Sequence, residues 1–525
     1  MSALLLFVLL TALPIPPPLD PLAGALRHQQ NQAVVTAFDQ AAQAGAPAPS
    51  DKPWFSLTRN RAGTLRFFLL IAAALGAATL SASLPVRGKI AFMHFLVMCG
   101  VTIGIAGWIG QWKIPQGDTL WWFIPIPHSV TSPVGCFLNR NHFGGFVAIL
   151  CPIALAIISH EFSRKRWIIA PFYALILAVM GMCVALSLSR GALLAMGAGL
   201  VASTLVITFR HRKAWGVLLF ACMVAGGLLL FSQTTVVRER FSGIQNPTGI
   251  NSVQSRLAEW RESLRVWPHY PIIGAGMNAL RMVYPQYRQT SVGARLIHAE
   301  NEYVQLLAEG GLVGVGLAVA LILTARSRIR ETTEPIPGVI IIAVTGALTV
   351  TGVHCLFDFP AHLPLYALVM GSIAGLLLPT GPGILIKNGR VLLALPSLIG
   401  FIGATLILVN HPRDLKNQDD PEYLYTANYR ELHQALVRAP TSSAWLYLGR
   451  AMYKEGATRG DYTLCAEGET FMSQAALLDP QNYRLWYELG HTRLALKRND
   501  SATEAFRRAQ QLRSWLSVPP IPGSP

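Results

Sequence analysis

The sequence predicts an all-α, polytopic membrane protein with about eleven transmembrane helices and a C-terminal α-helical repeat segment. The composition is the first reason, because 52% of the residues are hydrophobic and only 13% are charged, whereas soluble domains carry about 25% charged residues. The second reason is that eleven apolar stretches are long enough to cross a bilayer, which takes roughly 20 helical residues. The third is that basic residues gather in short loops between these stretches.

The predicted spans start at the N-terminus and recur along most of the chain. They lie near residues 2–18, 66–84, 89–111, 143–159, 167–187, 191–208, 214–232, 303–324, 338–357, 363–380 and 391–409. The first stretch has no basic residue before its apolar run and no small-residue cleavage site after it, so we interpret it as a span rather than a signal peptide. Its abrupt start leaves open a further helix upstream.

The net charge of +16 would suggest a nucleic-acid partner in a soluble protein, but its distribution here indicates membrane orientation. Five short loops carry the basic clusters: Arg87–Lys89, Arg164–Arg166, Arg210–Lys213, Arg326–Arg330 and Lys387–Arg390. If the eleven spans alternate, all five loops fall on one side, which the positive-inside rule identifies as cytoplasmic. The C-terminus then lies outside, in the periplasm of a bacterial inner-membrane protein, and no nucleic-acid partner is expected.

This orientation divides the chain into three parts: an N-terminal span and outer loop at 1–65, a transmembrane domain at 66–409, and an outer tail at 410–525. Shorter segments also face outward. They are a polar loop at 19–65 rich in Pro, Ala and Gln, a loop at 112–142 with Trp121 and Trp122, a tight turn at Ser187–Gly191, and a large loop at 233–302.

The large loop contains one predicted amphipathic helix. Its apolar residues recur at intervals of four and three, as one face of a helix requires; they are Val253, Leu257, Trp260, Leu264 and Trp267. Asn251 or Ser252 can cap its start, and Pro268 or Pro271 helps to end it. We expect this helix to lie on the membrane surface or to close over a cavity.

The tail has the spacing of tetratricopeptide repeats, which pair two helices and stack on one another. One unit is marked by Trp486, Leu489, Gly490, Ala502, Phe506 and Ala509, and an earlier one by Trp445, Leu448, Gly449, Ala475 and Pro480. A third unit can extend from Tyr423 to Pro440. Trp486 follows Trp445 by 41 residues rather than the usual 34, which predicts an insertion around Ala457–Thr463. The tail is expected to act as a scaffold or to bind a protein partner.

Arginines on the outer face are informative because the orientation rule does not explain them. They are Arg140, Arg190 and, in the large loop, Arg238, Arg240, Arg256, Arg261, Arg265, Arg281, Arg288 and Arg295. The planar guanidinium makes bidentate contacts to phosphate, so such residues near a membrane suit a phosphorylated lipid headgroup. For most of them the structural explanation is favoured, in which they are solvated or paired with Glu239, Glu259 and Glu262. For Arg190, at a membrane boundary, a functional role is favoured.

His298 opens the sharpest motif, His298-Ala299-Glu300-Asn301-Glu302-Tyr303, which is followed by Leu306, Leu307, Glu309, Gly310, Gly311 and Gly314. A histidine at the mouth of a span and next to carboxylates can act as a general base toward a hydroxyl group. An ordinary interfacial histidine is an equally good reading of the residues alone.

In these motifs, residues 66–380 resemble the superfamily of O-antigen ligases and polymerases, which are membrane glycosyltransferases. The resemblance rests on several short motifs in the family's order, all on the predicted outer face. They are Gly135 to Asn141, Ser189-Arg190-Gly191, Arg256-Leu257 with Trp260, Pro271 to Gly276, His298 to Gly314, and His354 to Pro360 with His362 and Pro364.

The resemblance implies transfer of a glycan from undecaprenyl pyrophosphate to an acceptor hydroxyl on the periplasmic face. It implies that His298 activates the acceptor, and that Arg190 and Arg256 hold the pyrophosphate and stabilise its charge as it leaves. Substrate binding is assigned to Arg140, Asn141, Glu300, Asn301 and Arg261. No cofactor or metal is expected: outer loops lack a DxD-like pair, and the seven cysteines lack zinc-site or disulfide spacing.

The acceptor separates the alternatives within this chemistry. A lipid or other envelope acceptor makes the protein a ligase of lipopolysaccharide biosynthesis, a growing glycan makes it a polysaccharide polymerase, and a protein makes it an O-oligosaccharyltransferase. A transporter or flippase would need intramembrane charges and broken helices, whereas here the ionisable residues concentrate at the outer boundary rather than in the middle of spans. A non-catalytic envelope scaffold would require neither His298 nor Arg190.

Overall fold

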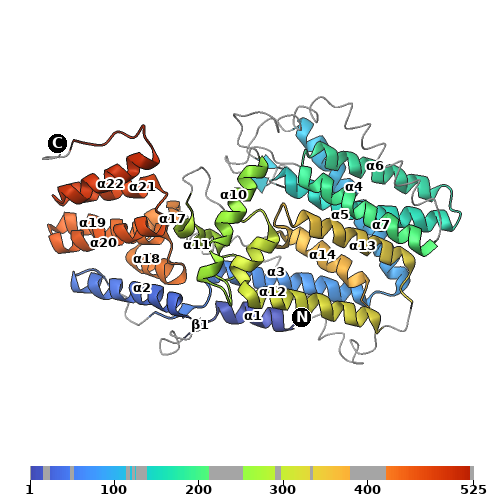
Figure 1. Cartoon of the computed structure of the whole chain (residues 1–525), viewed down its shortest axis with the longest axis horizontal. Helices are drawn as coiled ribbons and strands as arrows, with labels where there is room; N and C mark the ends of the chain where they lie inside the picture. The colour runs from blue at the N-terminus through green and yellow to red at the C-terminus, as the bar shows by residue number, and fades with distance from the viewer. Residues whose placement is uncertain are drawn as a thin grey trace.

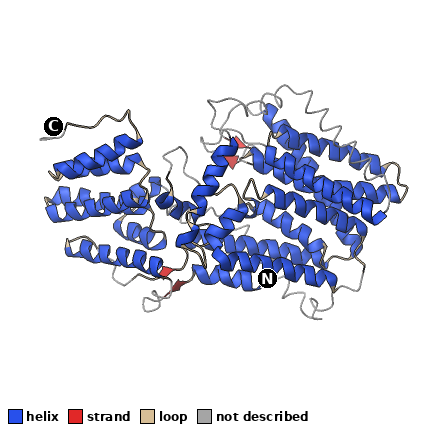
Figure 2. Ribbon diagram, viewed as in Figure 1, coloured by secondary structure: helices blue, strands red, loops and turns tan. Residues whose placement is uncertain are grey.

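The computed structural model describes residues 2–15, 24–47, 53–113, 119–120, 124–125, 137, 139–211, 252–289, 297–331, 335–378 and 421–520 (Figure 1). Almost all secondary structure in these ranges is α-helix, which confirms the predicted all-α membrane fold. The strands within these ranges form two pairs of two residues each (Figure 2), β1 (Pro14–Ile15) with β2 (Phe55–Ser56) and β3 (Thr119–Leu120) with β4 (Ile124–Pro125).

Six helices within the described ranges are long and apolar enough to cross a membrane. They are α3 (Arg61–Ser83), α4 (Val86–Lys113), α5 (Arg140–Ser163), α6 (Ile169–Leu186), α7 (Arg190–His211) and α12 (Glu302–Arg330). Three shorter apolar helices pack with them: α1 (Ser2–Ala12), α13 (Gly338–His354) and α14 (Pro364–Leu376). These nine helices match nine of the predicted spans, and the spans predicted at 214–232 and 391–409 lie outside the described residues.

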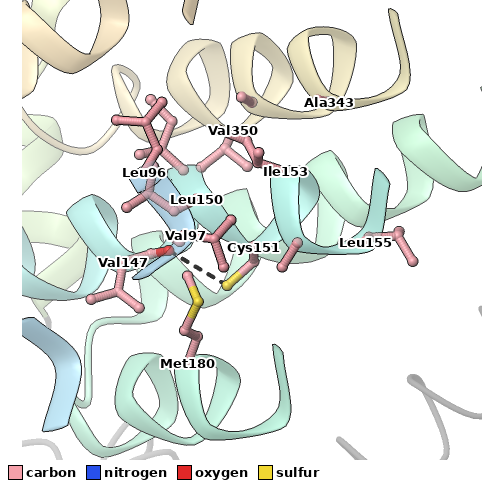
Figure 3. Close-up of a cluster of buried hydrophobic side chains, with 14 of the residues drawn as sticks. Leu96, Val97, Val147, Leu150, Cys151, Ile153, Leu155, Met180, Ala343 and Val350 are labelled. Atoms are coloured by element: carbon pink, nitrogen blue, oxygen red, sulfur yellow. Dashed lines mark hydrogen bonds between the residues drawn. The ribbon is translucent and has the colours of Figure 1, made fainter. Parts of the chain in front are cut away.

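Helix α5 forms the centre of the bundle, with α4, α6, α7 and α13 around it. Its residues from Phe143 to Ile158 are all buried. Figure 3 shows side chains of this core, in which Cys151 donates a weak 3.5 Å hydrogen bond to the carbonyl oxygen of Val147 on the preceding turn. Because α5 is apolar on every side, it belongs in the interior of the bundle, as the hydropathy of its sequence indicates.

Helices α7 and α13 pack at close range through glycine. A Cβ atom on Gly199 would lie 2.7 Å from the carbonyl oxygen of Gly346, and one on Gly346 would lie 2.9 Å from that of Gly199. Ser203 adds a 3.0 Å hydrogen bond to the carbonyl oxygen of Ile342. Small residues and interhelical hydrogen bonds are the usual means by which helices associate in a membrane.

The span predicted at 303–324 is not a continuous helix. Gly311 has φ of 60° and ψ of −162°, and it breaks α12 after its first nine residues. The loop at 271–276 docks at this break, where the N–H groups of Ala275 and Gly276 bind the carbonyl oxygens of Ala308 and Glu309 at 2.9 Å. The docked loop replaces helical hydrogen bonds, and this replacement makes a broken helix tolerable.

Two expectations for the N-terminal segment are wrong. The first span, predicted at 2–18, is helical only to Ala12, because Pro14 and Ile15 pair with β2 instead. The segment predicted as a polar loop at 19–65 contains the helix α2 (Ala25–Gln43). Its buried residues Val34, Ala37, Phe38 and Ala41 have helical spacing and belong to the same apolar core as the tail.

The tail forms a helical layer beside α2 (Figure 1). Its helices are α17 (Pro421–Thr426), α18 (Tyr429–Arg438), α19 (Ser442–Arg459), α20 (Tyr462–Leu478), α21 (Tyr483–Ala495) and α22 (Asn499–Leu512), and α19 packs with α20 as α21 does with α22. Residues 457–463 form the end of α19, a turn at Gly460 and the start of α20. The extra length of the first unit is therefore helical, since α19 has 18 residues and α21 has 13. The tetratricopeptide identity of the tail stays a prediction.

Candidate active site

Polar side chains gather at one end of the helix bundle, where segments distant in sequence meet. Helices α5 and α7 begin there, α13 ends there, and residues 297–301 lead into α12. The predicted amphipathic helix is confirmed as α10 (Ser252–Leu264), which is followed by the short helix η3 (Trp267–His269). Helix α10 lies across this end of the bundle (Figure 1), and its Trp260 donates a 3.3 Å hydrogen bond to the carbonyl oxygen of Glu300.

His298 lies where the chain reverses direction before α12. Glu300 has φ of 50°, a value that residues other than glycine seldom adopt. Asn301 then caps α12, because its side-chain oxygen accepts hydrogen bonds from the N–H groups of Tyr303 and Val304. This turn sets the half-buried ring of His298 parallel to Phe359, with 3.9 Å between the ring centroids.

Gln305 holds one nitrogen of His298. Its Oε1 accepts from the N–H group of Ala299 at 3.1 Å, so its Nε2 donates to His298 Nδ1 at 2.9 Å and to Glu309 Oε1 at 3.3 Å. The same Nε2 lies 3.2 Å from His362 Nε2. In this arrangement the neutral His298 ring carries its proton on Nε2. Among the described residues Nε2 has no hydrogen-bond partner, which leaves it available to a substrate group.

His362 is a positive charge behind His298. It lies in the short helix η4 (Pro360–His362), with Nδ1 3.1 Å from Glu302 and Nε2 3.4 Å from Glu309. Burial alone would lower the pKa of His362, but the two carboxylates outweigh it and raise that pKa to about 10. Burial and then the charge of His362, whose ring centroid is 5.1 Å away, lower the pKa of His298 to about 3. His298 is therefore neutral near pH 7 while His362 is protonated.

Backbone N–H groups fix the carboxylate of Glu309. Glu309 accepts hydrogen bonds from the N–H groups of Asn278 at 2.7 Å and Leu280 at 2.9 Å. Both donors follow the loop that docks on the break in α12, so the broken helix and the ionised carboxylate depend on one loop.

Asp358 forms a second buried charge cluster at the end of α13. Its carboxylate lies 3.2 Å from His142 Nε2 of α5 and 3.1 Å from His354 Nε2. Burial alone would raise the pKa of Asp358, but the two histidines outweigh it and hold that pKa well below its usual range. Together with the 2.7 Å hydrogen bond from Arg256 Nη1 to the carbonyl oxygen of Phe357, these contacts fasten the turn after α13.

Arg256 also faces Glu300, with 3.8 Å between Nη2 and the carboxylate. Burial and the negative charge of Asp358 raise the pKa of Glu300 to about 7, although Arg256 opposes this. Arg190 is the first residue of α7, and a Cβ atom on the next residue, Gly191, would lie 3.0 Å from Phe357. The start of α7 and the guanidinium of Arg256 thus both adjoin Phe357.

Three other predicted substrate-binding residues lie on α5 and α10. Arg140 and Asn141 form the first turn of α5, where the Asn139 side chain accepts from the Asn141 N–H at 2.8 Å. They precede His142, which contacts Asp358. Arg261 is exposed on α10. It lies roughly 140° around the helix from Arg256, since each residue turns an α-helix by about 100°. The structure does not bring Arg261 together with the other candidates.

One loop arginine has a structural partner in the tail. Arg288 donates hydrogen bonds of 3.1 and 2.7 Å to the carboxylate of Asp479. Glu262, predicted to pair with an arginine, accepts from the backbone N–H of Gln289 at 3.0 Å. Glu239 lies outside the described residues.

The polar and ionisable residues around His298 had no predicted roles, although most of them occur in the quoted motifs. They are His142, Glu302, Gln305, Glu309, His354, Asp358 and His362. A signal was present on α12, because positions 302, 305 and 309 are spaced by three and four residues and share one helix face. The partner of that face, His362, is 53 residues beyond Glu309, and helical spacing cannot identify it.

Replacement of His362 by glutamine is expected to lower the free energy of unfolding by roughly 3–5 kcal/mol at pH 6, because it leaves two buried carboxylates without their cation. The folded pKa of about 10 exceeds the usual unfolded value of about 6.5. Protonation of His362 therefore stabilises the protein fully below pH 6.5, and this contribution is lost as the pH rises toward 10. Denaturant unfolding of the purified protein at several pH values measures the difference.

The exposed His491 in the tail provides the matched control, since His491→Gln should change stability little at any pH. An equal stability of wild type and His362→Gln at pH 6 would contradict the assigned charge on His362.

A comparison with protein families covers part of this site. The family model described as O-Antigen ligase matches residues 175–319. The matched segment contains Arg190, Arg256 and His298, and it ends within α12, before the turn that carries Asp358 and His362. No curated protein matches the chain.

Proposed function

We propose that this chain, whose residues 175–319 match the family model described as O-Antigen ligase, transfers a glycan from an undecaprenyl-pyrophosphate carrier to an acceptor hydroxyl on the periplasmic face of the inner membrane. The acceptor is a lipid or another envelope molecule. The family match supports, in general terms, a glycosyl transfer of the ligase or polymerase type. The donor, the side of the membrane and the roles of individual residues are our proposals.

The observation that carries the proposal is the position of His298, which lies at the same end of the bundle as Arg256 and whose Nε2 has no hydrogen-bond partner among the described residues. Neutral imidazole is the form that can accept a proton from an attacking hydroxyl. In the reaction, the acceptor oxygen forms a bond to the anomeric carbon of the first sugar as the bond from that carbon to the pyrophosphate breaks. The hydroxyl proton passes to His298, and the electron pair leaves with the pyrophosphate.

The leaving pyrophosphate needs positive groups that do not have to reorganise. Arg256 donates a hydrogen bond to the carbonyl oxygen of Phe357, and Gly191, which follows Arg190 at the start of α7, lies against the Phe357 side chain. Arg190 thus opens a helix whose first N–H groups point toward the same end of the bundle. Two guanidinium groups and a helix N-terminus suit a pyrophosphate, because bidentate hydrogen bonds match its oxygens. In this proposal these groups bind the donor and stabilise the charge that develops as it leaves.

For His298 to accept a proton on Nε2, its own proton must lie on Nδ1. That tautomer forms when the Gln305 amide turns over, so that Oε1 accepts from His298 Nδ1 and from protonated His362, at the cost of the bonds to Ala299 and Glu309. The two orientations of one amide therefore correspond to two states of His298, a donor and a base.

A Gln305→Glu variant tests which state is active. The introduced carboxylate accepts from Nδ1 and leaves Nε2 as a base, so transfer is expected to stay within about tenfold of wild type, whereas Gln305→Leu, which removes the hydrogen bond, should be slower than Gln305→Glu. Initial rates of glycan transfer by the purified variants decide this. If Gln305→Glu is the slower of the two, His298 acts as a hydrogen-bond donor through Nε2 rather than as a base.

The acceptor distinguishes the alternatives that share this chemistry. A polysaccharide polymerase and a protein O-oligosaccharyltransferase would use the same donor groups and differ in the molecule whose hydroxyl attacks. Helix α12 is broken at Gly311, a feature that transporters share. Transport is nevertheless disfavoured, because the clustered ionisable groups lie at the ends of the helices, around residues 298–309 and 354–362. A scaffold without activity would not need His298 neutral and accessible.

Reconstitution tests the proposed reaction. Purified protein is incubated with an undecaprenyl-pyrophosphate-linked glycan and candidate lipid, glycan or protein acceptors, with and without a chelator. A transferred glycan, formed at equal rates in both conditions, is the expected result. A reaction that requires added metal would contradict the metal-independent chemistry, and transfer to one acceptor class identifies the activity.

Glycan analysis of the envelope after gene deletion should show lipid-linked chains accumulating untransferred.

The proposed orientation has its own test. The five basic loops predict that the C-terminus lies in the periplasm. A reporter active only in the periplasm, fused after Pro525, should therefore be active, and a cytoplasm-specific reporter at the same position should be silent. The opposite pattern would reverse the orientation and move the candidate site to the cytoplasmic face.

A further inference from the structure

A cavity of about 220 Å³ lies outside the candidate active site, between α2, the tail and the large loop. Helix α2 contributes Gln29 and Gln30, and α11 (Leu280–Tyr287) contributes Gln286. The tail contributes Trp445 and Gln474 from α19 and α20. The cavity thus exists only because these three parts of the chain pack together.

The lining is rich in neutral hydrogen-bonding groups. Four glutamine amides line the cavity beside the aromatic rings of Tyr270 and Trp445, and none of the described lining residues is acidic. Each amide offers two donor protons and an acceptor oxygen. Amides that both donate and accept, next to aromatic surface, suit a ligand that carries many hydroxyl groups and also has apolar faces.

The inner wall contains a buried donor without a partner. Arg59 is 3% exposed, and it donates hydrogen bonds to the Asn31 side chain at 2.8 Å and to the carbonyl oxygen of Arg27 at 3.2 Å. Its Nε is buried and has no hydrogen-bond partner among the described residues. Beside it, Tyr270 is 1% exposed and its hydroxyl bonds to Gln30 at 3.2 Å. A ligand oxygen in the cavity would supply the acceptor that Arg59 lacks.

We propose that this cavity binds one sugar ring of the glycan, as a subsite apart from the reacting atoms. Sugar hydroxyls both donate and accept, and the apolar face of the ring can pack on Tyr270 or Trp445. The volume is below the roughly 300–1,000 Å³ of drug-sized sites, which fits a single ring rather than a long chain. The choice of a glycan as the ligand rests on the proposed glycan transfer.

The position of the cavity favours a role in holding the glycan chain. Tyr270 lines it, and the same loop continues to Asn278 and Leu280, whose N–H groups hold Glu309 in the candidate active site. A glycan bound at both places would run along this loop. The subsite would then hold a sugar distant from the pyrophosphate and orient the chain for transfer.

Calorimetric titration of the full-length protein tests the subsite. The probe is the reducing oligosaccharide that mild acid releases from the lipid-linked glycan. Wild type should bind it, and the double variant Gln286→Leu, Gln474→Leu should bind roughly tenfold more weakly, since two hydrogen-bonding side chains are removed. Gln434→Leu, at an exposed position of α18, is the matched control and should bind as wild type does. Thermal unfolding of each variant checks that it is folded.

His298→Ala separates this subsite from the proposed reaction, because it should bind the free oligosaccharide as wild type does even where transfer is lost. If His298→Ala transfers normally while binding still depends on the two glutamines, the catalytic proposal fails and the subsite stands. Absence of binding by folded wild type up to about 10 mM, or equal affinities of wild type and the folded double variant, would overturn the subsite.

Discussion

His298→Ala is expected to lower the rate of glycan transfer by roughly 10²–10⁴-fold, the loss typical of a removed acid–base group. The protein should remain folded and inserted, since His298 is half-buried in a short loop. Its contacts among the described residues are one hydrogen bond to Gln305 and two ring contacts. The donor should still bind, because Arg190 and Arg256 remain. Initial rates with purified protein, lipid-linked glycan and acceptor measure the effect, and donor binding is measured separately.

His269→Ala is the matched control, because His269 is an exposed histidine of the same large loop, in η3. It should transfer at the wild-type rate. Near-normal turnover by His298→Ala would exclude the assigned mechanism and return the scaffold interpretation to consideration.

Arg190→Lys and Arg256→Lys are each expected to lower transfer by about 10²-fold, close to the cost of removing one preorganised donor from a charged transition state. Lysine keeps the charge, but a point charge cannot reproduce the planar fork that binds two phosphate oxygens. If the fork acts mainly on the leaving charge, the loss should appear in kcat rather than in KM. Steady-state kinetics over a range of donor concentrations measure both constants.

Arg430→Lys controls for the substitution itself, since Arg430 is exposed on α18 in the tail. Protein levels should be equal in all variants. Full activity in both Arg190→Lys and Arg256→Lys would show that the fork is not needed at either position, and the pyrophosphate assignment would then have to be abandoned.

Most of the membrane fold could be predicted from the sequence because it depends on local composition. A run such as residues 143–159 is apolar on every side, and nothing but a membrane or the centre of a bundle can accommodate it. Helix α10 was likewise predicted from the spacing of its apolar residues, and its end before Pro268 follows from local chemistry.

The errors in the fold arise where distant segments replace local interactions. Gly311 breaks α12 because residues 271–276 supply the hydrogen bonds that the helix gives up there. Helix α2 was interpreted as a loop because Ala and Gln are weakly apolar, although Val34, Ala37, Phe38 and Ala41 are spaced for one buried face. These four residues share one apolar core with the tail, which packs against this face of α2.

In the candidate site, too, some features could be proposed from the sequence and others depend on the tertiary structure. His298, Arg190 and Arg256 stay candidates proposed from the sequence: His298 and Arg190 from their motifs and positions, and Arg256 from the family resemblance. The charge state of His298 was decided by tertiary structure, since it depends on His362, held between Glu302 and Glu309. Electrostatic effects act over a few ångströms in space rather than along the chain, so only the folded arrangement shows that burial and the neighbouring His362 lower the pKa of His298.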